Sequence, residues 1–273
     1  ATFLFGIVYE AYYGRLYDWY LLLPPVGLLQ SWIPLSEFHL IPNGSSWSLC
    51  AFFLFYVLFS PLFIWLNTMP LRRLLTVLAV GLLCYFAIAL SLPHRWVDAI
   101  VYIFPAMRVP ELVLGIVLYR FYRSDASRRL QEWLSRCSVP ALSLLEFSAL
   151  LLPIAAFLSF QSVPEGVRLA SLFWLPLLFI LWLFTVTDDY GGFVTRLFHT
   201  RQMMFLGGIS FEIYLLHMFF IPSVRHAFVA VGYPSRGLLC MLVSAVVTIV
   251  ASYLVKKCYV DPVFSRFKNL IPT

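Results

Sequence analysis

The sequence has little charge for its length. Only 12% of its 273 residues are charged, whereas 62% are hydrophobic. An ordinary soluble domain carries about 25% charged residues, since its surface has to be hydrated. This shortage excludes a soluble globular enzyme, a disordered chain and a nucleic-acid-binding module. Long apolar runs without the alternation of barrel strands predict instead an all-α, polytopic helical membrane protein.

Motifs typical of soluble enzymes and of metal sites are absent as well. The sequence contains no GxSxG, HExxH, P-loop or Rossmann pattern, and no CxxC pair. We therefore expect no disulfide framework, no metal site and no bound cofactor. The five cysteines lie far apart, at positions 50, 84, 137, 240 and 258.

Seven segments approach the roughly 20 apolar residues that a membrane-spanning helix needs. These predicted spans are residues 47–67, 74–92, 99–120, 141–160, 169–187, 207–222 and 237–255. Residues 1–14 are predicted to be a partial N-terminal span. Residues 21–33 are also apolar, but Pro24 and Pro25 favour a half-helix or interfacial segment over a span. No shift in composition marks a second domain, so residues 1–273 are expected to form a single membrane domain.

The basic residues predict the orientation in the membrane. Of the 19 lysines and arginines, thirteen fall in the loops after the first, third, fifth and seventh spans and five on the other side. Because cytoplasmic loops are enriched in lysine and arginine, the C-terminus is predicted to be cytoplasmic. This bias explains the net charge of +6 without a nucleic-acid partner. Residues 120–140, on the same side, are predicted to include an amphipathic surface helix.

Arg108 is the one basic residue that falls inside a predicted span. Pro105 and Pro110 flank it, so the helix is expected to break there, which membranes tolerate only beside protein or a water-filled cavity. Glu111 lies three residues on and can face Arg108 on one helical turn. The pattern predicts either a pocket for an anionic or polar substrate or a structural ion pair that closes a kink.

A second polar group lies in the segment 207–217. The spacing of Ser210, Tyr214 and His217 places them on one helix face, whereas Glu212 falls off it. This face could line a cavity, with His217 as a base or hydrogen-bond donor. Hydrogen bonds between helices are the alternative, and the spacing alone favours it.

The loop before the first complete span carries further polar residues. Ser46 is predicted to cap a helix that begins near Trp47, an aromatic residue of the membrane interface. The triplet beginning at Asn43 is a formal glycosylation sequon. Glu37 and His39 are expected to lie in a solvated loop, and Glu146, inside a span, is a weaker pocket candidate.

Four segments occur together in a recognisable order. They are residues 28–34 followed by Ser46-Trp47-Ser48-Leu49, residues 108–112 with Gly115, residues 206–217, and Asp261-Pro262. Together they resemble the acyltransferase 3 family, integral membrane enzymes that O-acylate carbohydrates, and the resemblance covers nearly the whole chain.

The resemblance implies transfer of an acyl group, expected to be acetyl, from acyl-CoA to a sugar hydroxyl of a cell-surface or secreted glycan. Acyl-CoA would be a co-substrate, and the expected partners are the bilayer and a glycan or lipid-linked sugar acceptor. The implied location is the inner membrane of a bacterium. The residues expected to bind substrate are Trp47, Ser48, Arg108, Glu111, Tyr214 and His217.

The sequence also departs from the family pattern. Family members typically have ten spans, so two are expected before Ala1, and the Arg and His of the family's first span match no segment here. Catalytic residues are therefore not assigned. Phe52 stands where the family usually has an acidic residue. A truncated or inactive homologue is one alternative. A transporter or lipid-linked sugar flippase is another alternative, since a broken helix with an intramembrane arginine fits a transporter as well as an acyltransferase.

Overall fold

The computed structural model describes residues 2–12, 14, 17–41, 43–168 and 171–268, and every regular element in these ranges is helical. The chain forms two compact units, each described by itself. The central unit comprises Leu28–His39 and Trp47–His199, and the terminal unit comprises Ala1–Gly27, Leu40–Ser46 and Thr200–Thr273. The all-helical fold predicted from composition is confirmed for the described residues.

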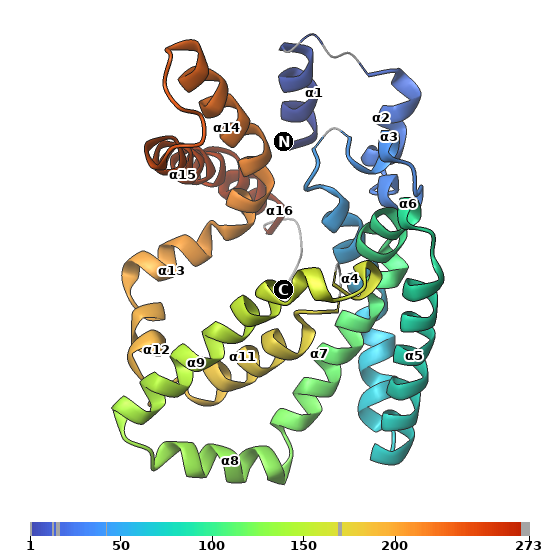
Figure 1. Ribbon diagram of the computed structural model, residues 1–273, viewed down its shortest axis with the longest axis vertical. Helices are drawn as coiled ribbons and strands as arrows, with labels where there is room; N and C mark the ends of the chain where they lie inside the picture. Colours follow the sequence, from blue (N-terminus) through green and yellow to red (C-terminus); the bar gives the residue numbers. More distant parts are fainter. Residues whose placement is uncertain (1, 13, 15–16, 42, 169–170, 269–273) are drawn as a thin grey trace. The chain divides into compact units, whose positions relative to one another are not determined.

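The first half of the central unit is built on α4 and α5 and on a bent helix pair (Figure 1). Leu66 of α4, Leu74 of α5 and Ile116 of α7 form one buried apolar cluster. Short helices lead into this core. The elements are η1 (Gln30–Trp32), α3 (Ser36–His39), α4 (Trp47–Thr68), α5 (Leu71–Ser91), α6 (His94–Val97), η2 (Asp98–Ile103), η3 (Pro105–Arg108) and α7 (Val109–Tyr122).

The second half of the central unit packs α9 against α11, side by side in Figure 1. Leu142 and Ala149 of α9 meet Trp182 and Leu183 of α11 in a second buried cluster, which Leu134 of α8 joins. The elements are α8 (Asp125–Ser135), α9 (Val139–Leu158), η4 (Phe160–Ser162), α10 (Glu165–Arg168), α11 (Trp174–Val186) and α12 (Phe193–Phe198).

The terminal unit is organised around α14 and α15, which pack along each other. Its prolines act locally: α2 contains Pro24 and Pro25 and ends at Val26, and Leu28 then takes a positive φ of 54°. Residues 21–33 therefore do not form a spanning helix, as the prolines predict. The elements are α1 (Thr2–Tyr12), α2 (Trp19–Val26), α13 (Arg201–Gly208), α14 (Ser210–Ala230), α15 (Leu238–Val255), η5 (Lys256–Val260) and α16 (Asp261–Lys268).

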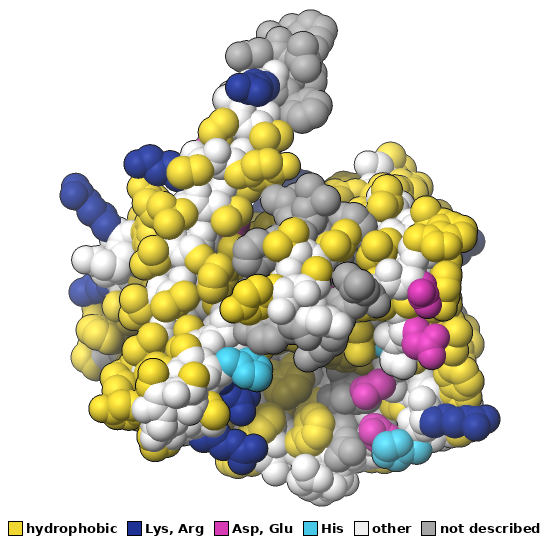
Figure 2. All heavy atoms as spheres, turned by 90° about the horizontal axis from the view of Figure 1, so that it is seen from above, with side chains coloured by type: hydrophobic (Ala, Val, Ile, Leu, Met, Phe, Trp, Pro, Cys, Tyr) yellow, Lys and Arg dark blue, Asp and Glu magenta, His cyan; other side chains and the backbone are white. Residues whose placement is uncertain are grey.

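Within the described residues, five helices are long and apolar enough to cross a membrane, and six if the bent pair counts as one. They are Trp47–Thr68, Leu71–Ser91, Val139–Leu158, Ser210–Ala230 and Leu238–Arg266, with the pair His94–Ile103 and Pro105–Tyr122 bent by 64°. Most of their apolar side chains stay exposed, and Figure 2 shows hydrophobic side chains over much of the face it presents. Such helices need a lipid environment.

Two predicted spans differ from the structure. In the described part of the segment 169–187 the apolar helix is α11, with 13 residues, which is about 20 Å long and shorter than a bilayer core of about 30 Å. Thus the seven predicted spans become six and a shorter apolar helix. The span predicted at 207–222 is instead α14, which begins at Ser210 after a break at Ile209 and continues through Pro222 to Ala230.

The predicted amphipathic segment contains α8, whose two faces differ sharply. Leu134 is buried and packs on the α9–α11 cluster, whereas Trp133 is 62% exposed. Ser124 caps the helix by accepting a hydrogen bond from the Ser127 backbone N–H. The hydroxyl of Ser127 in turn accepts a bond from Trp182 Nε1 at 2.8 Å, which ties α8 to α11.

Candidate functional site

The helix break at Arg108 has a local cause in its prolines. Phe104 is extended, with φ −62° and ψ 122°, as expected for a residue that precedes proline. Pro105 then opens the short helix η3, and Pro110 sits in the first turn of α7, where a missing N–H costs nothing. The sequence thus produces the bend at Phe104 and places Arg108 four residues beyond it, at the end of η3.

Arg108 and Glu111 form the ion pair that their spacing predicts. Arg108 Nη2 lies 2.5 Å from Glu111 Oε1, and the side chains are only 14% and 27% exposed. Trp174 of α11 donates its indole N–H to the same carboxylate oxygen at 3.1 Å. The carboxylate therefore links the bend to α11. This agrees with the structural alternative predicted for Arg108 and Glu111, an ion pair that closes a kink.

Two aromatic rings cover the Arg108 guanidinium. Its Cζ lies 5.7 Å from the ring centroid of Trp47 and 5.4 Å from that of Tyr102, within cation–π range. Trp47 and Tyr102 also contact each other, with ring centroids 4.8 Å apart. The start of α4 and the bent pair therefore build one aromatic box around the charge. Ser48, the next residue of α4, is buried.

Two buried polar atoms of this region lack a hydrogen-bond partner. Among the described residues, Arg108 Nη1 and the Tyr85 hydroxyl are buried and have no hydrogen-bond partner. Tyr85 is 3% exposed, and its ring centroid lies 5.0 Å from that of Trp174. Because buried donors without acceptors are costly, each one needs an acceptor that the described residues do not supply.

The loop around Asn43 and helix α14 form a second polar cluster, in the terminal unit. Asn43 Nδ2 donates to the Leu215 carbonyl at 2.8 Å, and the Tyr214 hydroxyl donates to the Ser45 carbonyl at 3.3 Å. His217 Nδ1 lies 2.6 Å from the Tyr214 carbonyl. Because a carbonyl only accepts, Nδ1 carries the proton in this hydrogen bond.

The structure thus brings the six predicted substrate-binding residues together in two groups. Trp47 and Ser48 begin α4, and Trp47 contacts Arg108, which pairs with Glu111 in the central unit. Tyr214 and His217 share one turn of α14 in the terminal unit. A single cavity formed by both groups stays a prediction.

Several residues of the second cluster differ from expectation. Ser210 is exposed and donates to the Gly207 carbonyl, whereas Glu212, off the predicted face, is buried. Asn43 is 2% exposed and its amide is bound to α14, so the sequon is not accessible in the folded chain. The Ser46 hydroxyl donates to the Asn43 carbonyl at 2.7 Å, and its predicted capping of α4 stays a prediction.

The outer-loop residues separate into one exposed and one buried side chain. Glu37 is exposed, as expected. His39 is 5% exposed, and its Nδ1 is buried without a partner in the described part of the chain. Burial lowers the pKa of His39, against smaller opposing effects of the Ile33 backbone and the Asp98 charge. The solvated-loop prediction for His39 is therefore wrong, because α3 packs its imidazole inward.

Glu146, the weaker pocket candidate, has a structural role. Its carboxylate accepts hydrogen bonds from the backbone N–H groups of Gly192, Val194 and Thr195, at 2.6, 2.8 and 3.3 Å. The Thr195 hydroxyl adds a fourth bond at 2.7 Å. These N–H groups open α12 and lack partners within the helix, so Glu146 is a helix cap supplied by α9.

Sequence reasoning missed Tyr85, Tyr102 and Trp174. All three lie in apolar stretches, where tyrosine and tryptophan are ordinary lipid-facing or interfacial residues. A weak signal was available, since each ring has a polar tip that needs a partner when it is buried. The sequence alone cannot show which rings turn towards Arg108.

Comparison with known proteins gives one match. A model of the acyltransferase 3 family, described as an acyltransferase domain, matches residues 1–257. No curated protein and no solved structure matches the chain. The matched range includes both polar clusters and all six residues predicted to bind substrate.

Proposed function

The chain belongs to the acyltransferase 3 family, and on that premise we propose that it transfers an acyl group from acyl-CoA to a sugar hydroxyl of a glycan. The family implies membrane acyltransferase activity, which agrees with the long apolar helices of the structure. The family match carries the proposal, and the unpartnered Arg108 Nη1 at the helix break supports it.

The proposed reaction is an exchange of one bond for another. The sugar oxygen attacks the thioester carbonyl carbon, a C–O bond forms, the C–S bond breaks, and the hydroxyl proton ends on the thiol of CoA. Negative charge develops on the carbonyl oxygen in between, and a fixed donor in a dry site stabilises it. We assign this role to Arg108, which has one nitrogen held by Glu111 and one without a partner among the described residues. No residue of this chain is assigned as the base.

The depth of Arg108 suits a reaction between a cytoplasmic donor and an outer acceptor. Helix α7 has 14 residues, so Arg108 lies about 21 Å from the far end of that helix. In the predicted orientation this far end is cytoplasmic, and a hydrocarbon core of about 30 Å leaves Arg108 closer to the outer face. We propose that Trp47 and Ser48 of the central unit contact the acceptor sugar, and that Tyr214 and His217 of the terminal unit also bind substrate.

The test measures transfer of radiolabelled acetyl from acetyl-CoA to glycan in membranes that contain the full-length protein. We expect labelled glycan with the wild type, and about 100- to 1,000-fold less with Arg108→Gln, the range for removal of one oxyanion donor. Arg72→Gln is the matched control, because Arg72 is exposed at the start of α5. Labelling that persists in Arg108→Gln contradicts the role of Arg108. No labelled glycan with any acyl-CoA contradicts the function and favours the transporter, flippase or inactive homologue.

A further inference from the structure

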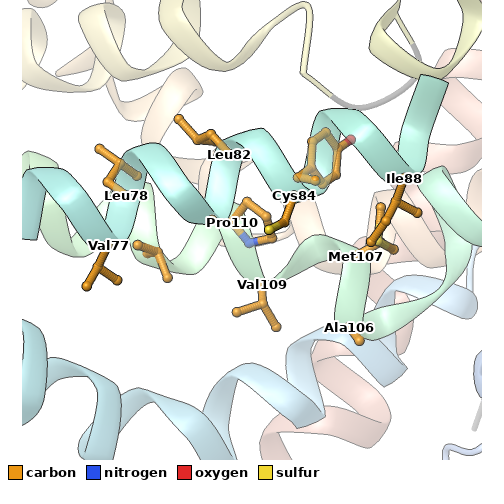
Figure 3. Close-up of a pocket in the computed structure, with 12 residues that line it drawn as sticks. Val77, Leu78, Leu82, Cys84, Ile88, Ala106, Met107, Val109 and Pro110 are labelled. Carbon is orange, nitrogen blue, oxygen red and sulfur yellow. The ribbon is translucent and has the colours of Figure 1, made fainter. Parts of the chain in front are cut away.

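The end of α14 and the loop that leads to α15 form an open pocket of about 210 Å³ in the terminal unit. The described residues that line it are Pro222, Arg225, His226, Val229 and Ser235. The first four repeat at the spacing of one helix face, and Ser235 belongs to the loop. By contrast, no charged side chain is among the described residues that line the apolar groove of Figure 3, between α5 and the bend of η3 and α7. The pocket at α14 therefore differs from that groove by its basic side chains.

The turn after α14 holds Ser235 against this helix face. Gly232 takes a positive φ of 79°, and its N–H donates to the Val229 carbonyl at 3.0 Å. The Tyr233 N–H donates to the Phe228 carbonyl at 2.9 Å. These two bonds form the Schellman pattern that closes helix ends, and the rings of Phe228 and Tyr233 add its apolar contact, with centroids 6.3 Å apart. The local sequence thus fixes the path of the loop that carries Ser235.

The positive charge of the pocket has no carboxylate to balance it from the loop or from α15. No aspartate or glutamate occurs between Glu212 and Asp261. Within the described residues, the side chains of Arg225 and Ser235 make no hydrogen bond or ion pair. Arg225 is exposed and Ser235 is half-buried, so both are accessible to a ligand. The planar fork of an arginine matches the oxygens of a phosphate, and a serine hydroxyl can add one more donor.

The pocket lies at the level of lipid headgroups. Helix α14 and the helix that begins at Leu238 are both long and apolar enough to cross a membrane, so the loop between them lies at a membrane surface. This loop and the start of α15 also carry exposed apolar side chains, namely Val231, Tyr233 and Leu238. At this level of a membrane, a phosphate group attached to an apolar chain is available to Arg225.

We propose that this pocket, called here the phosphate pocket, binds the phosphate diester of a lipid, with Arg225 as its cationic partner and Ser235 as a hydroxyl donor. The volume is roughly seven times the share of one water molecule in the liquid, which accommodates a phosphate group and the first atoms attached to it. Phospholipids and lipid-linked sugars both carry this group, and the experiment separates them. The proposal goes beyond the proposed function, because such binding requires no acyl transfer.

The experiment measures how strongly lipids slow the reaction of N-ethylmaleimide with the thiol of Val229→Cys, a position that lines the phosphate pocket. The full chain is used in detergent with Cys137→Ser and Cys258→Ser, and the natural thiol of Cys84 serves as the reference. Cys84 is exposed and lines the apolar groove of Figure 3, in the central unit. The added compounds are phosphatidylglycerol, polyprenyl phosphate glucose, diacylglycerol and inorganic phosphate.

We expect at least one of the two phosphate lipids to slow labelling of Val229→Cys by about fivefold or more as the site fills, and diacylglycerol and inorganic phosphate by less than about twofold. Cys84 should react at an unchanged rate. A lower half-maximal concentration for polyprenyl phosphate glucose than for phosphatidylglycerol identifies a lipid-linked sugar as the ligand. An equal or higher one identifies a phospholipid headgroup.

Four outcomes overturn the proposal. If neither phosphate lipid slows the reaction, the pocket binds no such group. Equal slowing by diacylglycerol shows that an apolar chain suffices, and equal slowing by inorganic phosphate shows a site for a soluble anion. Equal slowing at Cys84 shows that lipid covers the whole surface rather than one pocket.

Two arginines near the loop give a matched pair of variants in the Val229→Cys chain. Arg225 lines the phosphate pocket, whereas Arg236 is exposed next to Ser235 and does not line it. Arg225→Gln should raise the half-maximal lipid concentration about tenfold or more, because a hydrogen bond to a charged group is lost. Arg236→Gln removes the same charge and should raise it less than about threefold, since salt screens an exposed charge. Equal rises would indicate general attraction of anionic lipid to the loop and contradict the pocket.

Ser235→Ala tests the hydroxyl donor, because it removes one oxygen and leaves the backbone of the loop unchanged. We expect the half-maximal lipid concentration to rise about threefold, the share of one ordinary hydrogen bond. An unchanged value would contradict the role of Ser235 in the phosphate pocket. These measurements need neither acyl-CoA nor turnover, so their outcome and that of the acyl-transfer assay are independent.

Discussion

The two terminal nitrogens of Arg108 differ in their surroundings. Nη2 binds Glu111 Oε1, whereas Nη1 is buried and has no partner among the described residues. Burying a charge costs several kcal/mol unless it is paired, and the carboxylate with two aromatic faces offsets this cost. Arginine–carboxylate pairs are frequently bidentate, whereas this pair leaves Nη1 without a partner among the described residues, in agreement with the role proposed for Arg108.

His39 presents the opposite case of a buried group without a firm counter-charge. Burial holds its pKa below the ordinary value of 6.5, although Asp98 and the Ile33 backbone oppose this shift. As the pH falls through 6.5, the unfolded chain therefore binds a proton that the folded chain does not. We expect the thermal unfolding temperature of the detergent-solubilised protein to fall between pH 7 and pH 5.

The variant His39→Gln should reduce the pH dependence of the unfolding temperature, because it removes the imidazole whose protonation the folded chain disfavours. His94→Gln is the control, since the His94 side chain is 86% exposed. A profile that keeps its slope in His39→Gln would assign the acid sensitivity to other groups.

At the scale of elements, several charged side chains act as caps for helices to which they do not belong. Arg120 of α7 donates through Nη1 to the carbonyls of Leu66 and Met69, at 2.7 and 2.8 Å, where α4 ends. Lys256 of η5 donates to the Gly208 carbonyl at the end of α13. Both residues count towards the basic bias of the sequence, yet each also closes a helix end.

Periodicity and proline patterns predicted the helices better than the residues that their side chains contact. The break at Arg108 and its ion pair with Glu111 follow from two prolines and a spacing of three residues, all local features. The contacts of Glu146 with α12 and of Trp174 with Glu111 join residues 46 to 63 positions apart. Such contacts depend on tertiary packing, which local patterns do not encode.

The cap at Glu146 gives a prediction at this scale. Glu146 is 1% exposed and accepts three backbone bonds and one hydroxyl bond. Glu146→Gln replaces an acceptor oxygen by an amide that faces donors, so we expect a loss of roughly 2–3 kcal/mol in the free energy of unfolding. Glu132→Gln, at an exposed position of α8, should change it by less than about 0.5 kcal/mol. Chemical denaturation in detergent measures both, and equal values would contradict the capping role.

At the scale of the whole molecule, the long helices keep their apolar side chains outward. In the five long helices only 17–22% of the most apolar window is buried inside the structure. In water such a surface would aggregate, whereas in a bilayer the lipid covers it. The charge bias predicts the direction of insertion, with the thirteen basic residues of one side in the cytoplasm.

The predicted orientation is testable on the two sides of α15, which runs from Leu238 to Val255. Cys258 is exposed at the predicted cytoplasmic side, and Arg236 is exposed just before α15 on the other side. In sealed right-side-out vesicles, a membrane-impermeant maleimide should leave Cys258 unlabelled and label Arg236→Cys in a Cys258→Ser chain. Inside-out vesicles should give the reverse result, because the 18 residues of α15 cover about 27 Å. Labelling of Cys258 in right-side-out vesicles would place the C-terminus outside, and the cytoplasmic route for acyl-CoA to α7 would then be wrong.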